Sequence, residues 1–297
     1  MDFFILIIAA ATPILTLVIF VNCHNDRNPN NSNFMDMLVT FAFIVVLASV
    51  IHSSYNNTSV LKSVGYISEL IYIGLTAFLP AVLYMLFISV FDKLKPEPFR
   101  YLFFSAIIGG FAAIIASLMG LEYKAGELMD SYSVAKITNI GFWKIAVPSE
   151  VIKWFSLLIF LKFNKYYDEY LDAVVYSVCL SMGFASIICV KYMAGFIGAD
   201  WGTFIIQGLI TALILIPVNL FAGTIMGYFL ALAKYKNKIL NFVFSLIIPV
   251  VLYSFLVSVF WNWMPYTFGG IAILAVALYY KIRQLRALDK INSNNVE

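Results

Sequence analysis

The chain has 297 residues, of which 62% are hydrophobic and only 12% are charged, with a formal net charge of +3. Soluble domains carry roughly 25% charged residues, so this composition excludes an ordinary soluble protein and indicates an integral membrane protein. The small positive charge does not indicate a nucleic-acid partner, because the basic residues lie in short segments between apolar runs. The expected fold class is all-α, a bundle of transmembrane helices whose first partner is the lipid bilayer.

Nine apolar runs follow one another along the chain, each near or above the roughly 20 residues that a helix needs to cross a bilayer core. The first run has no basic residue before it and Asp2 as its only early charge, which is typical of a retained helix rather than a cleaved signal peptide. We therefore expect about nine transmembrane helices, over residues 3–22, 34–52, 66–91, 99–121, 141–163, 172–197, 203–233, 239–263 and 266–282.

The basic residues divide unequally between the two sides that these helices define. If the first connector is cytoplasmic, 13 Lys and Arg residues lie on the cytoplasmic side and 4 on the other side. Short cytoplasmic loops of membrane proteins carry an excess of Lys and Arg. The sequence thus predicts an outside N-terminus and a cytoplasmic C-terminus.

Two opposite charges stand inside the apolar run 141–163. Glu150 and Lys153 are one helical turn apart, so their side chains lie on one helix face. Charges inside hydrocarbon are costly unless they pair with one another or serve a function. Lys191 is a further charge inside an expected helix. Glu150 and Lys153 are therefore the first candidates for catalytic residues.

Several short stretches have the order and spacing of a known protein family. They lie at residues 78–80, 92–98, 148–153, 172–176, 183–185, 222–223 and 227–228. The stretch 148–153 reads Pro-Ser-Glu-Val-Ile-Lys and is similar to a Glu-Glu-x-x-Lys motif. From about residue 75 to residue 256, the chain resembles the PrsW-type intramembrane proteases.

This resemblance carries over three polar residues directly, namely Glu150, Lys153 and Asp172. It implies a multi-pass endopeptidase of a bacterial inner membrane that acts on a membrane-anchored protein or peptide. It also implies three parts of the chain: two additional transmembrane helices in residues 1–65, a PrsW-like protease core in residues 66–264, and a last transmembrane helix with a basic cytoplasmic tail in residues 265–297.

Five further positions match the family's motifs in place but not in residue type. The first glutamate of the Glu-Glu pair, a later Glu-Asn pair and two histidines are replaced. The residues at these positions are Ser149, Ile188 and Cys189, and Asn219 and Tyr253.

The depth of these positions in the bilayer indicates whether they belong to one site. A helix rises about 1.5 Å per residue, so Glu150, Ile188, Asn219 and Tyr253 lie roughly 18 to 24 Å from the cytoplasmic ends of their helices. They therefore share one layer in the outer half of the membrane. Asp172 lies at the cytoplasmic end of its own helix, too far from Glu150 for the two carboxylates to share a water.

A catalytic metal is not expected in this layer. Catalytic zinc needs about three His, Cys or carboxylate ligands and an open position for water. The chain has 2 histidines, His24 and His52, and both lie outside the matched region. Within the layer, Glu150 and Cys189 are the only plausible ligands, so we expect no metal and no other cofactor.

Two pairings of the buried charges stay open. Ser149 and Lys153 are four residues apart and have the spacing of a serine–lysine dyad, although pairing with Glu150 would keep the ammonium charged. Lys191 lies at nearly the depth of Glu150 and could neutralise it in a buried ion pair. Alternatively, Lys191 extends outward to the headgroups on its long stem.

Two functions follow from these residues. The first is an active intramembrane endopeptidase that uses Glu150 as a base or ligand with rearranged partners. The second is a protease homologue whose catalytic residues are largely replaced, a pseudoenzyme that binds a membrane-embedded segment. The replaced residues favour the second. A small-solute transporter is the third alternative, and it would require polar residues along a path.

Overall fold

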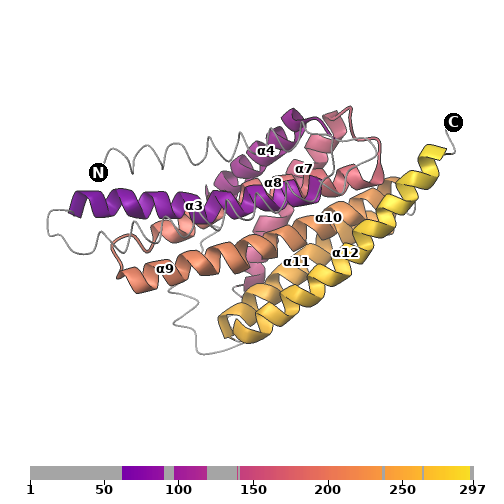
Figure 1. Ribbon diagram of the computed structural model, residues 1–297. Helices are drawn as coiled ribbons and strands as arrows, with labels where there is room; N and C mark the ends of the chain where they lie inside the picture. The colour runs from indigo at the N-terminus through magenta and orange to yellow at the C-terminus, as the bar shows by residue number, and fades with distance from the viewer. Residues whose placement is uncertain are drawn as a thin grey trace.

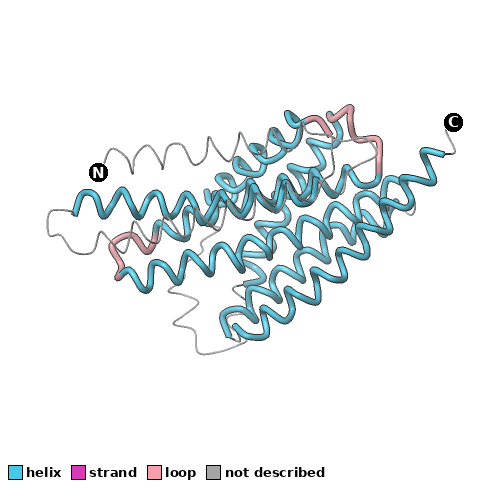
Figure 2. Tube along the Cα trace, viewed as in Figure 1, coloured by secondary structure: helices cyan, strands magenta, loops and turns pink. Residues whose placement is uncertain are grey.

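The computed structural model describes residues 62–89, 97–118, 139, 141–235, 238–262 and 264–294. Every regular element in this part of the chain is a helix, and the helices run side by side as one elongated bundle (Figures 1 and 2). In chain order the elements are α3 (Lys62–Ser89), α4 (Phe99–Leu118), the π-helical segment η1 (Gly141–Ala146), α7 (Val147–Phe163), α8 (Tyr170–Ala194), α9 (Trp201–Ile210), the π-helical segment η2 (Thr211–Leu215), α10 (Ile216–Tyr235), α11 (Lys238–Asn262) and α12 (Met264–Asn294).

Five of the expected spans are long and apolar enough to cross a membrane. They are Ser68–Ser89, Phe99–Leu118, Tyr170–Ala194, Trp201–Lys234 and Lys238–Leu256. The prediction of an all-helical, polytopic membrane protein is thus confirmed, whereas the count of nine spans is not. The expected helices 3–22 and 34–52 lie outside the described residues. Residues 141–163 form a continuous helical run, η1 followed by α7, but four charged residues interrupt its apolar character.

Helix α8 is the centre of the bundle. It packs against α3, α4 and α10, and 83% of its most apolar window is buried. Two glycines explain its close contact with α4, because a Cβ at Gly109 would overlap the carbonyl oxygen of Leu180 and a Cβ at Gly183 would overlap that of Ala106. Small residues allow helix backbones to approach closely in a membrane, where van der Waals packing drives association.

Helices α8 and α10 are held together by the same means. A Cβ at Gly223 would meet the side chain of Ser181, and a Cβ at Gly227 would meet the backbone at Ala173. The hydroxyl of Ser177 donates a hydrogen bond of 2.7 Å to the carbonyl oxygen of Gly223. The close approach keeps this face of α10, which also carries the site residues, against the centre of the bundle.

Both π-helical segments end just before a proline. Segment η1 ends at Ala146, two residues before Pro148, and η2 ends at Leu215, two residues before Pro217. Proline has no N–H to donate, and its ring clashes with the carbonyl group four residues earlier, so the preceding turn widens. The polar residues of the candidate site follow these two prolines directly.

Candidate functional site

The candidate site is centred on a buried ion pair in the first turns of α7. The Nζ atom of Lys153 lies 2.6 Å from Oε1 of Glu150, and both side chains are 0% exposed. Glu150 lies in the first turn of α7, inside the continuous helical run that begins with η1. The two opposite charges therefore neutralise each other inside the bundle, as their spacing on the helix suggests.

Lys153 extends this pair to two other helices. Its ammonium donates a hydrogen bond of 3.1 Å to Oδ1 of Asn219 on α10. The amide nitrogen of Asn219 donates in turn to the carbonyl oxygen of Leu215 at 2.9 Å and to the hydroxyl oxygen of Tyr253 on α11 at 3.3 Å. One polar network thus joins α7, α10 and α11 at a single level of the bundle.

Two aromatic rings complete the surroundings of the ammonium group. The Nζ atom of Lys153 lies 5.1 Å from the ring centroid of Phe184 and 5.2 Å from that of Tyr253. Ring faces attract a cation, and the attraction is strongest where water is excluded. The positive charge of Lys153 is therefore held by a carboxylate, an amide oxygen and two ring faces without water.

Two buried oxygen atoms next to this network have no hydrogen-bond partner among the described residues. They are Oε2 of Glu150 and Oγ of Ser149. A buried polar group left without a partner costs about 1–3 kcal/mol, and a charged group costs more. These two atoms are the chemically unsatisfied part of the site, and any ligand or substrate contact would have to engage them.

The depth of the residues along their helices predicted part of this arrangement correctly. Glu150, Asn219 and Tyr253 belong to one network, which also includes Lys153. Ile188, assigned to the same layer, instead packs in an apolar cluster with Phe184 and the alanines of α4. Cys189, the next residue in the sequence, is also part of the apolar core.

Neither of the two alternative pairings is formed. Ser149 makes no hydrogen bond to Lys153, whose ammonium is engaged by Glu150 and Asn219, so the serine–lysine dyad is not assembled. The ion pair between Glu150 and Lys191 was a wrong expectation, since Glu150 is completely buried against Lys153 while Lys191 is exposed. Lys191 is seven residues beyond Phe184, about 10 Å farther along α8 and thus at another level.

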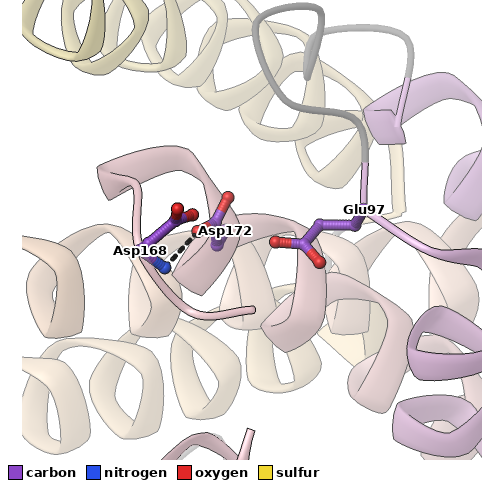
Figure 3. Close-up of side chains that lie close together, drawn as sticks. All are labelled: Glu97, Asp168 and Asp172. Carbon is purple, nitrogen blue, oxygen red and sulfur yellow. Dashed lines mark hydrogen bonds between the residues drawn. The ribbon is translucent and has the colours of Figure 1, made fainter. Parts of the chain in front are cut away.

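Asp172 belongs to a different group of residues, as its position at the end of α8 predicted. Its Oδ2 atom accepts hydrogen bonds from the backbone nitrogens of Asp168, at 2.9 Å, and of Glu169, at 2.6 Å. Glu97, which directly precedes α4, lies beside it and accepts a hydrogen bond from the hydroxyl of Tyr176 (Figure 3). No sequence pattern combines Glu97 and Asp168 with Asp172, although Glu97 stands in one of the matched stretches and Asp168 precedes Asp172 by four residues.

The fold and the buried network define a class of protein, a multi-pass helical membrane protein with a charged site inside its bundle. Residues 97–282 match the PrsW family of intramembrane metalloproteases, and the chain belongs to this family. The resemblance inferred from the short motifs is thereby confirmed.

Several bacterial relatives support this membership. Protease PrsW of Clostridioides difficile (strain 630) is 27% identical over 225 residues, which cover 73% of this chain and 89% of that protein. Protease PrsW of Bacillus subtilis (strain 168) is 24% identical over 226 residues, covering 73% of this chain and 95% of the relative. Protease PrsW of Oceanobacillus iheyensis is 27% identical over 224 residues, which cover 72% of this chain and 95% of that protein. No solved structure matches the chain.

The residues of the network do not fit the metal that the family description implies. Glu150 is its single carboxylate, and the oxygen Oε1 already faces an ammonium group at 2.6 Å. The other members, Ser149, Asn219 and Tyr253, supply a hydroxyl, an amide and a phenol in place of the His, Cys or carboxylate ligands that zinc prefers. A divalent cation on Glu150 would also lie next to the positive charge of Lys153, so we derive no catalytic step through a metal here.

Proposed function

We propose that this PrsW-family protein does not hydrolyse peptide bonds and instead binds a membrane-embedded segment of another protein or peptide, in the inner membrane of a bacterium. The observation that carries the proposal is the closed contact between Glu150 and Lys153, with both side chains 0% exposed. A general base must reach the water or substrate proton that it removes. The side chain of Glu150 is 0% exposed inside the bundle, and it is paired with Lys153.

The hydrogen bonds of Lys153 strengthen this argument. The ammonium of Lys153 is engaged by the carboxylate of Glu150 and by the amide oxygen of Asn219. While the network is intact, Glu150 and Lys153 therefore contact each other rather than a substrate or its water. The network links three helices and stabilises the site in its closed form.

The unsatisfied oxygens of Glu150 and Ser149 support a binding role. They need a hydrogen-bond donor, and the apolar lipid tails offer none. A polar side chain of a transmembrane segment can supply one. The helical run that carries both groups also exposes large apolar side chains, namely Trp143, Phe155 and Ile159, on which a second helix could pack.

An active endopeptidase is the second candidate function. The same two oxygens favour it, since Oε2 of Glu150 and Oγ of Ser149 are free to hold a water or a peptide group once the bundle opens. Transport of a small solute is a third possibility, and we rank it last because the buried charges of α7, Glu150 and Lys153, gather in one network rather than along a path.

Cleavage assays distinguish these functions. We would reconstitute the full chain in liposomes with single-span reporter proteins and test Protease PrsW of Bacillus subtilis in parallel for comparison. We expect no cleavage by this chain and no difference between the parent and Glu150→Gln. Cleavage by the parent that disappears in Glu150→Gln would overturn the proposal, and uptake of a solute by the same liposomes would favour a transporter.

Photocrosslinking tests the binding role in the same liposomes. A photoreactive amino acid at Phe155, on the exposed face of α7, should crosslink to a single-span reporter. The same amino acid at Val276, which is exposed on α12, serves as the matched control. Equal crosslinking at both positions would indicate random collisions in the bilayer and contradict a specific binding face.

A further inference from the structure

Three carboxylates from three neighbouring segments meet at the end of the bundle where α4 and α8 begin. Glu97 directly precedes α4, Asp168 lies in the connector between α7 and α8, and Asp172 lies in the first turn of α8. One oxygen from each lies within 4.8 Å of the others. Figure 3 shows Glu97 reaching toward Asp172 from one side while Asp168 lies on the other.

This spacing suits a single cation. Oxygen ligands lie about 2.0–2.6 Å from Mg²⁺ or Ca²⁺, so two ligands of one ion are at most about 5 Å apart. The three carboxylates meet this condition without any movement of the backbone. They also differ in access, because Glu97 and Asp172 are buried while Asp168 is exposed. An ion could therefore enter from the side of Asp168.

A separate observation indicates that a ligand is missing at Asp172. Its Oδ2 atom accepts two backbone N–H groups and caps α8, whereas Oδ1 is fully buried and has no hydrogen-bond partner in the described part of the chain. A buried carboxylate oxygen without a partner is costly. Capping of α8 therefore satisfies Oδ2 of Asp172, whereas Oδ1 still needs a proton or a cation.

The charges around the cluster favour a cation. Lys234 of α10 is close enough to interact electrostatically with Asp168 and Asp172. Its ammonium also donates a hydrogen bond to the backbone carbonyl oxygen of Tyr167 and lies 3.5 Å from the centre of the aromatic ring of Tyr167. A divalent cation placed between the three carboxylates would further reduce the repulsion among their negative charges.

We propose that Glu97, Asp168 and Asp172 bind a divalent cation of the Mg²⁺, Ca²⁺ or Mn²⁺ class. The ligands are all carboxylate oxygens, which suit these hard cations, whereas zinc prefers His and Cys. The ion would tie the start of α4 to the connector and to the start of α8, and so fix the end of the central helix. This site is separate from the network of Glu150 and does not depend on the proposed function.

Terbium luminescence measures binding at this site directly. Tb³⁺ substitutes for hard divalent cations and is excited by nearby tyrosines, and Tyr176 is hydrogen-bonded to Glu97. We expect the metal-stripped, purified full chain to bind Tb³⁺ at one saturable site, with displacement by Mg²⁺, Ca²⁺ or Mn²⁺. Asp172→Asn and Glu97→Gln should each weaken binding by more than about tenfold, the lower end of the losses known for metal-site variants.

A matched control variant is available at the start of α9. Asp200 is an exposed carboxylate that accepts a hydrogen bond of 3.0 Å from the backbone of Thr203. Asn caps a helix as well as Asp does, so Asp200→Asn should keep both the fold and Tb³⁺ binding. Asp172→Asn likewise keeps an acceptor for the backbone N–H groups, and circular dichroism and gel filtration would verify that each variant is folded.

Thermal unfolding in detergent gives a second measurement. The parent should gain stability when EDTA is replaced by a divalent cation, and Glu97→Gln and Asp172→Asn should lose this gain. A parent that binds no Tb³⁺ and shows no divalent-dependent shift would overturn the proposal. So would equal binding by the parent and both variants, which indicates surface or lipid sites. Stability that is independent of divalent ions but rises on acidification would also overturn it, since a proton shared by Glu97 and Asp172 would then satisfy the cluster.

Discussion

The ammonium of Lys153 lies between a carboxylate oxygen of Glu150 at 2.6 Å and the amide oxygen of Asn219 at 3.1 Å. This position connects the ion pair of α7 to α10, and through Asn219 to Tyr253 of α11. A buried ion pair contributes little by itself, because removing both charges from water offsets most of their attraction. Its main consequence is that neither partner can be removed alone without leaving a buried charge.

The first prediction concerns this pair. Lys153→Met should destabilise the folded protein by about 3–5 kcal/mol, because Glu150 would stay buried without its partner. The double variant with Glu150→Gln should recover a large part of the loss, since no unpaired charge remains. Unfolding in a denaturing detergent, followed by circular dichroism, would give the free energies for a double-mutant cycle.

A matched lysine on the same helix serves as the control for this cycle. Lys162 is exposed in the last turn of α7, so Lys162→Met should change stability by less than about 0.5 kcal/mol. Independent effects of the two substitutions, with a coupling energy near zero, would show that the pair does not hold the site together.

The second prediction concerns the contact between α4 and α8. Gly183→Ala should destabilise the protein by about 1–3 kcal/mol, because the added methyl group overlaps the carbonyl oxygen of Ala106 and forces the helices apart. Gly74 on α3 has no atom within 4 Å of the place of a Cβ. Gly74→Ala should therefore leave the melting temperature unchanged or raise it. Similar melting temperatures for the two variants would contradict the close packing of α4 on α8.

The buried network shows which part of such a site is predictable from the sequence. A constant rise per residue gives the level of each residue, and this placed Glu150, Asn219 and Tyr253 together. It does not give the direction of a side chain around its helix or its reach. From level alone, Lys191 stays open as a partner of Glu150, which in the structure pairs with Lys153. Level alone likewise places Ile188 in the polar layer, although it packs against apolar neighbours.

The irregular parts of the helices and the paths of the connectors are harder to predict from the sequence. A proline inside a long helix, such as Pro217, predicts a bend. The widened turn before it, and the same feature before Pro148, depend on how freed carbonyl groups find partners in the bundle. The acidic cluster of Glu97, Asp168 and Asp172 depends on the path of the connector between α7 and α8. Residues up to 75 positions apart along the chain, Glu97 and Asp172, meet there only because α4, α7 and α8 share that end of the bundle, and no local pattern contains this information.

The third prediction concerns the way α12 is attached to the centre of the bundle. The carboxylate of Asp289 accepts hydrogen bonds from the backbone nitrogens of Tyr170, at 2.8 Å, and Leu171, at 3.2 Å, at the start of α8. These nitrogens are among the groups that a helix leaves without partners inside itself. Asp289→Ala should therefore loosen the end of α12, at a loss of about 1 kcal/mol.

Limited proteolysis would reveal this loosening. The last turns of α12 contain Arg286 and Lys290, so trypsin should remove the end of the chain faster from Asp289→Ala than from the parent. Asp289→Asn keeps one acceptor oxygen and should give an intermediate rate. Equal rates for all three proteins would show that this contact does not hold the end of α12.

The fourth prediction concerns the residues that differ from the family's motifs. If the replaced residues are the reason that the network does not fit a catalytic metal, then restoring them should create a metal site. The variant Ser149→Glu with Asn219→His and Tyr253→His would supply a second carboxylate and two imidazoles beside Glu150. The three positions are at one level, since Asn219 contacts both Lys153 and Tyr253, and Ser149 precedes Glu150 on the same helix.

Metal analysis of the purified proteins provides the measurement. The triple variant should retain zinc after gel filtration, whereas the parent and the single variant Ser149→Glu, which lacks both imidazoles, should not. The loss of the bond between Asn219 and Lys153 would also free the ammonium to turn toward Phe184, away from the metal. Zinc bound by the parent and lost in Glu150→Gln would contradict this interpretation, because it would show that the native residues already form a metal site without histidine.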